Sequence, residues 1–408
     1  MKKLLVLALA AFVSIPSFAQ SLSVSSEVKT GLIWERVEDR RKEADSVVTG
    51  IRMGSMDDAG SLDGRFRVDL VYTNADGNVG FKTRFNWEEF TNRETGFGPF
   101  WTYGFAWGSF FNDQLALSLG KLGASPWSSG GPYMWRELEL APTGGLRVEW
   151  KPSFIPGELN VGFVLNWINT GLTDAGLGTG TEAASFSLED VLSESVIGMS
   201  YKNDWFMVRA AYRFDSEADF DRAIGTDPFR EGGSLVYRVE EYALQRWVSG
   251  LSLYALGEFD GIGSEKPDIN FFTRNWVFIQ YAPPAFTAEL QLGLEILPLG
   301  LEAVNLGFEA YYTQKIVLIR PSFFYNLFDG LISPGIIIGY ANDFGNAKKV
   351  PGSAYSYFEF EPTVQANLAP GAYISLSYYW RMENQFNPLL YPPEQQTQWI
   401  NLRAGITF

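Results

Sequence analysis

The 408-residue sequence contains no histidine and no cysteine. Without histidine, the chain cannot form a Ser-His-Asp triad, a Cys-His nucleophile pair or a His-ligated zinc site. Catalysis by carboxylates alone stays possible in principle. Without cysteine, an exported chain has no disulfide framework, so its stability must come from a large closed structure. We therefore expect no enzyme, no cofactor and no metal centre.

Basic residues are also in short supply, with 32 Lys and Arg against 47 Asp and Glu and a formal net charge of −15. No basic stretch is long enough to follow a phosphate backbone, which argues against nucleic acid as a partner. Beyond the N-terminus no run of apolar residues reaches the length of a membrane-spanning helix. Aromatic residues nevertheless make up 16% of the chain. A transmembrane β-barrel needs many aromatic side chains, because they form a girdle at each of its two membrane interfaces.

Residues 1–19 have the pattern of a secretory signal peptide. Lys2 and Lys3 precede the apolar run 4–13, which is too short to span a bilayer. Small residues on both sides of Phe18 are typical of a cleavage site before Gln20. We expect residues 1–19 to be removed on export and residues 20–408 to form a single domain.

The C-terminal stretch 397–408 alternates strictly between an apolar face and a mostly polar face. This alternation predicts a β-strand with one face in an apolar environment, and a soluble sandwich could also end this way. The chain stops on Phe408. The stretch resembles the last strand of bacterial outer-membrane β-barrels, in which a final Phe is recognised by the barrel-insertion machinery. The resemblance implies that Phe408 is an insertion signal and that the fold lies in outer-membrane lipid.

The same alternation recurs along the whole chain and predicts eighteen strands, or sixteen if two weak segments are not strands. We expect an all-β fold, a transmembrane antiparallel up-and-down β-barrel that closes between its first and last strands. The predicted strands are 22–34, 62–73, 79–87, 101–111, 115–119, 146–150, 159–167, 196–201, 206–214, 247–259, 270–281, 286–296, 304–312, 316–326, 331–341, 358–368, 374–382 and 397–408.

The links between these strands support a barrel, because outer-membrane barrels have short periplasmic turns and long external loops. Counted back from a periplasmic C-terminus, the predicted periplasmic links are 74–78, 112–113, 151–157, 202–204, 260–269, 298–301, 327–330 and 369–371. The predicted external links are 36–61, 88–98, 122–143, 168–195, 215–246, 282–285, 313–315, 342–353 and 383–396. Most links of the first set are short and most of the second are long; 282–285 and 313–315 are exceptions.

If the apolar faces meet lipid, the polar faces line a lumen. On the fourth predicted strand, the face that carries Tyr103, Phe105 and Trp107 is expected to meet lipid. The predicted pore-lining basic residues are Arg65, Arg67, Lys82, Arg84, Arg147, Arg209, Arg213, Arg381 and Arg403, and the acidic ones are Glu149, Glu289, Glu295, Glu309, Glu359 and Glu361. Burying so many charges in a dry interior would be costly, so they require an aqueous channel. Basic and acidic residues concentrate on different strands. This separation would produce a transverse electric field across the lumen. The alternative is an ordinary mixture of charges in a water-filled lumen.

The long link 122–143 is a candidate constriction loop. Its candidate residues are Trp127, Tyr133, Trp135, Glu137 and Glu139. By position and composition this link resembles the long loop of general porins, which folds inward and sets its acids against basic residues of the wall. The alternative is an exposed surface loop.

Together these features predict an outer-membrane porin for passive diffusion of small hydrophilic solutes and ions. Two other functions stay open. One is a substrate-specific channel of the fatty-acid or sugar type, and for sugars Tyr311, Tyr355, Tyr357, Tyr373 and Tyr379 could form an aromatic ladder. The other is an adhesin or surface antigen on a barrel scaffold. The resemblance to general porins also implies a possible homotrimer.

Overall fold

The computed structural model describes residues 19–39, 46–53, 65–88, 100–122, 126–127, 144–166, 195–214, 232–263, 272–299, 312–345, 356–384 and 395–407. These residues form nineteen strands and one 3₁₀ turn, η2 (Leu244–Arg246). Within these ranges, no helix combines the length and the apolarity that a membrane crossing needs.

The strands are β1 (Ala19–Asp39), β2 (Ser46–Met53), β3 (Arg65–Asn74), β4 (Val79–Glu88), β5 (Phe100–Phe110), β6 (Leu115–Lys121), β7 (Gly144–Trp150), β8 (Glu158–Asn166), β9 (Val196–Lys202), β10 (Phe206–Arg213), β11 (Gly233–Glu241), β12 (Leu251–Ile262), β13 (Phe272–Tyr281), β14 (Phe286–Leu299), β15 (Tyr312–Tyr325), β16 (Ile332–Asp343), β17 (Ser356–Ala369), β18 (Ala372–Asn384) and β19 (Gln395–Thr407).

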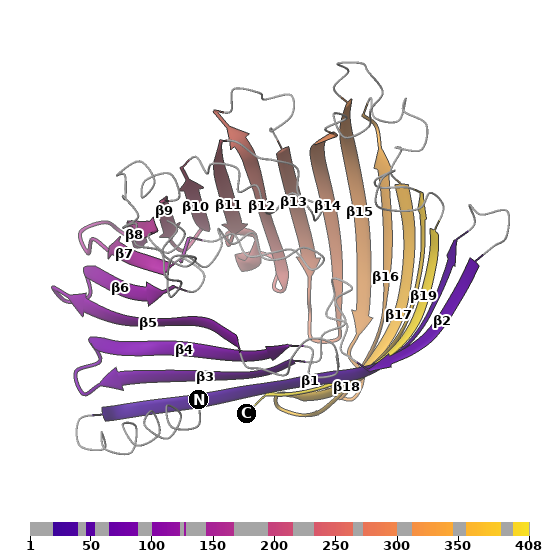
Figure 1. Cartoon of the computed structure of the whole chain (residues 1–408), viewed down its shortest axis with the longest axis horizontal. Coiled ribbons are helices and arrows are strands. Elements are labelled where there is room, and N and C mark those ends of the chain that lie inside the picture. The colour runs from indigo at the N-terminus through magenta and orange to yellow at the C-terminus, as the bar shows by residue number, and fades with distance from the viewer. Residues whose placement is uncertain are drawn as a thin grey trace, which may run out of the picture.

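All these strands belong to one sheet, in which consecutive strands pair antiparallel except β2 and β3, which both pair with β1. The sheet closes because β19 pairs antiparallel with β1, from Glu27 opposite Thr407 to Asp39 opposite Gln395. Figure 1 shows the strands following one another around the barrel wall. Closure leaves β1 and β19 without an open edge along this seam, as a fold in lipid requires. The fold is therefore the expected antiparallel β-barrel.

The first strand has three partners. Its N-terminal half pairs with β3, and its C-terminal half pairs with β2 on one side and β19 on the other. Since β2 and β3 both run antiparallel to β1, one after the other, they share a single position in the wall. The barrel therefore has the predicted eighteen strands plus one extra strand. The predicted link 36–61 was too long, because the end of β1 and all of β2 lie inside it.

The predicted strands and the described strands differ at two places. Strand β11 (Gly233–Glu241) lies inside 215–246, where the sequence predicts a loop. The predicted strand 304–312 lies outside the described residues except for Tyr312. In the described residues β14 pairs directly with β15, from Phe286 opposite Tyr325 to Leu299 opposite Tyr312.

Strand β11 also corrects the predicted direction of β12, β13 and β14. The links on the side of the termini are now 75–78, 111–114, 151–157, 203–205, 242–250, 282–285, 326–331 and 370–371. We call this side the short-link end and the other the long-link end. The links predicted at 260–269 and 298–301 follow β12 and β14 and so belong to the long-link end, whereas 313–315 lies within β15. The predicted links 282–285 and 313–315 are therefore no longer exceptions to the rule that external links are long.

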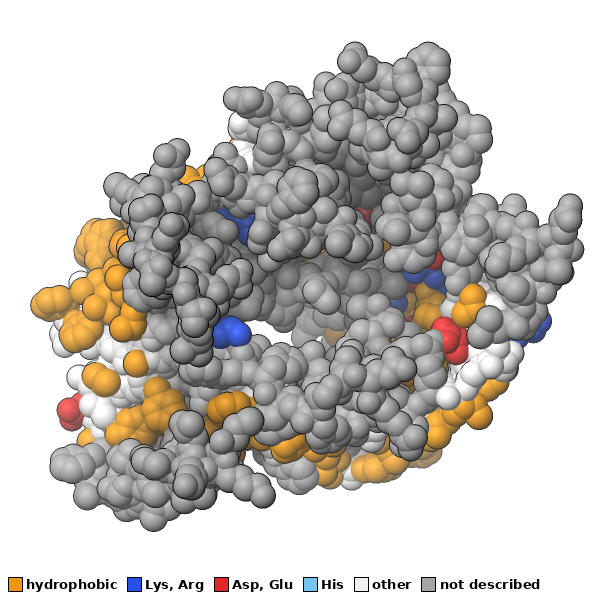
Figure 2. Space-filling view, viewed as in Figure 1, with side chains coloured by type: hydrophobic (Ala, Val, Ile, Leu, Met, Phe, Trp, Pro, Cys, Tyr) orange, Lys and Arg blue, Asp and Glu red, His pale blue; other side chains and the backbone are white. Residues whose placement is uncertain are grey.

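The two faces of the wall differ in chemistry. On β14, for example, Leu292 and Leu294 point outward and are exposed, whereas Gln291 and Glu295 point inward and are buried. In Figure 2 hydrophobic side chains gather on the outer surface at the left and lower right, and charged side chains lie beside the central hollow. An apolar outer face and a polar inner face are the arrangement that a barrel in a bilayer needs.

Candidate functional site

The inner wall of the barrel is the candidate functional site. Residues paired across neighbouring strands share a face, so the register places each predicted pore residue. The predicted residues that lie on the inner face are Arg67, Lys82, Arg84, Arg147, Arg209, Arg213, Arg381, Arg403, Glu149, Glu289, Glu295, Glu359 and Glu361. Arg65 occupies an inward position at the start of β3, but its side chain is not described; Glu309, Tyr133, Trp135, Glu137, Glu139 and Phe408 lie outside the described residues.

Strand β5 turns its aromatic face to the lumen, which corrects the sequence-based prediction. Tyr103 pairs with Arg84 and Phe105 with Lys82, so both rings share the inner face with these cations. Trp107 pairs with Gly80 on the same face. The outward residues between them are small. Because neither face of β5 carries charged side chains, either face could lie against lipid. The charges of the neighbouring strand, rather than the bulk of the aromatic side chains, decide which face turns inward.

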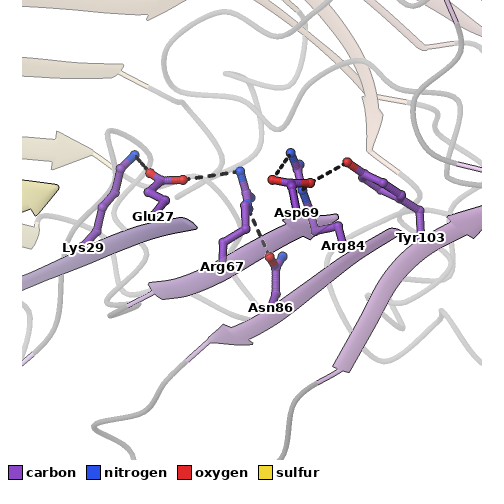
Figure 3. A network of polar contacts seen from close by, with 7 residues as sticks. All are labelled: Glu27, Lys29, Arg67, Asp69, Arg84, Asn86 and Tyr103. Atoms are coloured by element: carbon purple, nitrogen blue, oxygen red, sulfur yellow. Dashed lines mark hydrogen bonds and ion pairs between the residues drawn. The ribbon is translucent and has the colours of Figure 1, made fainter. Parts of the chain in front are cut away.

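A polar network begins on the inner face of β1 (Figure 3). Glu27 forms an ion pair with Lys29 Nζ at 2.9 Å and a longer one with Arg67 Nη1 on β3 at 3.6 Å. Arg67 Nε donates a hydrogen bond to Asn86 Oδ1 on β4 at 3.0 Å. One carboxylate thus holds two cations in place across the first strands.

Asp69 on β3 continues this network (Figure 3). Arg84 binds it with two parallel hydrogen bonds, from Nε at 2.7 Å and Nη2 at 3.0 Å, and the Tyr103 hydroxyl donates to it at 2.7 Å. Lys82 Nζ and Arg84 Cζ lie 5.5 and 5.0 Å from the centre of the Tyr103 ring. Bidentate pairing and cation–π contacts fix these side chains in defined directions. The wall here presents ordered cations to the lumen.

A second network crosses β15, β17, β18 and β19. Glu359 is 1% exposed; its Oε1 accepts from Arg320 Nε at 2.8 Å and its Oε2 accepts from the Tyr379 hydroxyl at 3.0 Å. The Tyr379 ring stacks on Trp399 with centroids 4.0 Å apart. Gly339 makes room for this carboxylate, since a Cβ there would lie 2.4 Å from Oε1. Both oxygens of the buried carboxylate are therefore satisfied.

A third cluster lies on β7 and β8. Arg147 Nε and Glu149 Oε1 are 2.8 Å apart, and Asn160 Nδ2 donates to Glu149 Oε2 at 2.8 Å. Arg147 also lies over the Phe105 ring, 5.6 Å from its centre. The predicted residues Arg147 and Glu149 are therefore partners of each other rather than two independent charges.

A fourth cluster lies near the short-link end of β10 to β13. Arg209 and Arg238 are directly opposite each other on the inner face. Arg238 Nε pairs with Glu240 Oε1 at 2.5 Å, and its Cζ lies 4.7 Å from the centre of the Tyr254 ring. Among the described residues Arg209 has no ion-pair partner. Like charges opposite each other are unfavourable unless water or an anion separates them.

Carboxylates are concentrated on the arc of the wall from β12 to β17. The inward carboxylates of this arc are Glu258, Asp260, Glu289, Glu295, Asp343, Glu359 and Glu361, and its described inward cations are Arg274 and Arg320. Strands β12 and β13 lie across the barrel from β3 and β4, which carry the cations of the first network. The inner wall therefore has an acidic arc that faces a more basic one.

The described part of the candidate constriction loop lies inside the barrel. Trp127 is fully buried and contacts Gly162 on β8 and Gly198 on β9. Both glycines are on the inner face, because Gly162 pairs with Glu149 as well as with Gly198. The indole thus lies against β8 and β9, two and three strands beyond β6, from which its link departs.

The predicted tyrosine ladder is described only in part. Tyr357, Tyr373 and Tyr379 occupy inward positions on β17 and β18. Tyr311 and Tyr355 lie outside the described residues. Trp399, which the sequence reading did not include, adds an inward ring beside Tyr379.

Several inward charges were missed from the sequence. They include Glu27, Lys29, Asp69, Arg238, Glu240, Glu258, Asp260, Arg274, Arg320 and Asp343. Arg238 lies on the strand that was taken for a loop, and Arg274 on a strand that is nearly apolar on both faces, so neither stood out as an alternating polar residue. Within the described residues, no cluster of three or more carboxylates is arranged as a metal site would be.

No model of a known protein family matches the chain, and no curated protein sequence is significantly similar to it. Solved structures are similar in fold. The outer membrane channel DcaP of Acinetobacter baumannii superposes with a TM-score of 0.54 at 9% identity, over 95% of this chain and 97% of that one. OccK1 and OccD3 of Pseudomonas aeruginosa each give a TM-score of 0.52, at 11% and 10% identity, over 96% of this chain and 100% and 92% of theirs. The chain thus shares the barrel fold of these proteins.

Proposed function

We propose that this protein is an outer-membrane porin that forms a water-filled channel for passive diffusion of small hydrophilic solutes and ions. The observation that carries the proposal is a closed barrel with an apolar outer face and an inner wall of charged side chains. Such a wall needs water, because an isolated charge in a dry interior is strongly unfavourable. A barrel of this strand number can hold an aqueous channel.

The proposal also covers the export of the protein, its membrane insertion and its location. Residues 1–19 would be removed as a signal peptide, Phe408 would present the insertion signal to the assembly machinery, and the barrel would lie in the bacterial outer membrane. A homotrimer is the proposed assembly, and native mass spectrometry of the detergent-solubilised protein tests it. A catalytic role is not proposed, because the chain lacks histidine.

Liposome swelling tests the diffusion channel directly. Vesicles that contain the purified, folded protein should swell in isotonic solutions of small neutral solutes such as glycerol or arabinose, and the rate should fall as solute size rises. Vesicles with heat-denatured protein serve as the control. If vesicles with folded protein swell no faster than the control for any solute, the barrel does not act as a diffusion channel and the adhesin alternative gains support.

A sugar-selective channel is the second candidate, and the inward rings of Tyr357, Tyr373, Tyr379 and Trp399 favour it. Aromatic faces can stack against the apolar faces of sugar rings. The same swelling assay separates the two functions. A general porin should admit sugars and amino acids of equal size at similar rates, whereas a sugar channel should favour the sugars and should be blocked by longer oligosaccharides.

A further inference from the structure

Three polar side chains on the inner face of β9 and β10 are open to the lumen. Ser200 and Arg209 are directly opposite each other, and Lys202 follows Ser200 on the same face. Within the described part of the chain, none of the three side chains forms a hydrogen bond or an ion pair. Ser200 and Arg209 are partly exposed, and Lys202 is exposed. Three neighbouring hydrogen-bond donors are therefore free to bind a solute.

Arg238 on β11 adds a second guanidinium to this group. It is directly opposite Arg209, and side chains in such a pair have Cβ atoms about 4.5–5.5 Å apart. Arg238 is held in place by its ion pair with Glu240 and by its contact with the Tyr254 ring. Two positive charges at this separation repel each other, so an anion between them would stabilise both.

The carboxylates of these strands do not supply that anion. On the inner face of β8 to β11, the described carboxylates are Glu158 and Glu240. Glu240 accepts hydrogen bonds on both oxygens, from Arg238 Nε and from the Tyr242 hydroxyl, the latter at 2.8 Å. Glu158 is opposite Lys202, yet these two described side chains form no ion pair. Arg209 thus has no counterion in the described wall.

Other arginines of the inner wall are bound to carboxylates, as Arg84 is to Asp69 and Arg320 is to Glu359. A guanidinium without a carboxylate keeps its planar set of donors available, and this set matches the oxygens of a carboxylate or phosphate group. Neighbouring strands lie about 4.8 Å apart. Side chains from β9, β10 and β11 can therefore reach the same small group.

We propose that Arg209, Arg238 and Ser200, with Lys202 beside them, form a binding site for one oxyanion group of a solute, either a carboxylate or a phosphate. The inference rests on the proposed channel function and adds to it a class of solute. Arginine binds such groups through charge-assisted and often bidentate hydrogen bonds. The site is local, so it is compatible with a weak preference of the whole channel for cations, which depends on all charges of the wall.

Calorimetry on the folded protein in an uncharged detergent tests binding separately from transport. Inorganic phosphate and acetate are titrated in turn at low salt, because salt screens the attraction between exposed charges. We expect saturable binding of at least one of them, with one anion per chain. Tighter binding of acetate would identify a carboxylate site, and tighter binding of phosphate a phosphate site. Binding of neither anion would overturn the proposal.

Substitutions on β10 and β11 locate the site. Arg209→Gln and Arg238→Gln should each weaken binding by about tenfold or more, as the loss of a hydrogen bond to a charged group implies. Arg213→Gln is the matched control. It removes the same charge from the same face of β10, but Arg213 Nη2 already donates to Ser234 Oγ at 3.2 Å. Equal weakening in Arg213→Gln would mean that general attraction by positive charge causes the binding, which would contradict a defined site.

The stability of the variants gives a second readout. Arg209→Gln removes a charge that only repels its neighbour, so the folded barrel should resist SDS without heating at least as well as the original protein does. A merely structural role of Arg209 would instead make this variant less stable. If Arg238→Gln does not fold, Arg209→Gln and Lys202→Gln carry the binding test.

Currents through planar bilayers separate the site from the channel. At constant ionic strength, the anion that binds should lower the current of the original protein more than that of Arg209→Gln. Equal lowering in both would place the site outside the ion path and contradict the inference. If the original protein conducts but binds neither anion, the site is refuted while the channel stands. If it binds an anion but does not conduct, the proposed function fails while the site stands.

Discussion

At the scale of residues, the inner wall is organised by carboxylates that each bind more than one partner. Glu27 holds Lys29 and Arg67, Asp69 holds Arg84 and Tyr103, and Glu359 holds Arg320 and Tyr379. These groups of partners differ in burial. The Asp69 group is partly open to solvent, whereas Glu359 and Arg320 are nearly fully buried. The Asp69 group should therefore affect ions in the channel, and the Glu359–Arg320 pair should affect the stability of the barrel.

Loss of Arg320 should destabilise the barrel. Arg320→Ala leaves Glu359 buried without its guanidinium, and breaking a buried pair in this way costs about 3–5 kcal/mol. The variant should unfold at lower urea concentration and lower temperature, as followed by the heat-dependent shift of the folded band on SDS gels. The double variant Arg320→Met, Glu359→Leu should recover most of the loss. Equal stability of Arg320→Ala and the original protein would contradict a buried ion pair here.

Loss of Asp69 should change ion selectivity rather than stability. Asp69→Asn removes the carboxylate that neutralises Arg84, so the wall beside β3 and β4 becomes more positive. The reversal potential in a KCl gradient should shift toward anion preference. Asp76→Asn, which removes the same charge from an exposed short link, is the matched control. A shift of equal size in both variants would mean that Asp69 does not face the ion path.

At the scale of elements, alternation predicted most strands but not always their orientation. The clear strands, such as β14 and β19, carry charges or amides on one face, and this polarity identifies the face that meets the lumen. Strand β5 has aromatic residues on one face and small ones on the other, so hydrophobicity alone chose the wrong face. The missed strand β11 alternates well, but it lies in a long stretch rich in acids and glycine that concealed it. The orientation of β5 and the assignment of β11 both depend on which strands pair with them, and the sequence does not reveal these partners.

Cysteine labelling can test the orientation of β5, because the chain has no cysteine of its own. Phe105→Cys places a thiol on the inner face and Ala106→Cys places one on the outer face. In vesicles, a charged, membrane-impermeant thiol reagent should modify the first and spare the second. Glu289→Cys and Leu292→Cys on β14 calibrate the labelling of inner and outer faces. Labelling of Ala106→Cys with protection of Phe105→Cys would restore the orientation predicted from the sequence.

At the scale of the whole molecule, the sheet is closed, and the lengths of its links fit an outer-membrane barrel once β11 is counted as a strand. Most of the short links then lie at the end that holds both termini, and the link 40–45 between β1 and β2 is an exception. The lumen wall combines an acidic arc on β12 to β17 with a more basic arc across it. The acidic residues of the chain outnumber its basic ones, with a net charge of −15. We expect a weak preference for cations, and clear anion selectivity in a salt gradient would contradict this distribution of charge.

The central claim is that the lumen of this barrel is a continuous water-filled path. The most direct test is the current through a planar lipid bilayer after addition of the purified, folded protein on one side. We expect stepwise increases in current, one for each inserted channel, with conductance that rises with salt concentration. A bilayer that stays silent at all voltages, although the folded barrel is shown to be inserted, would contradict it.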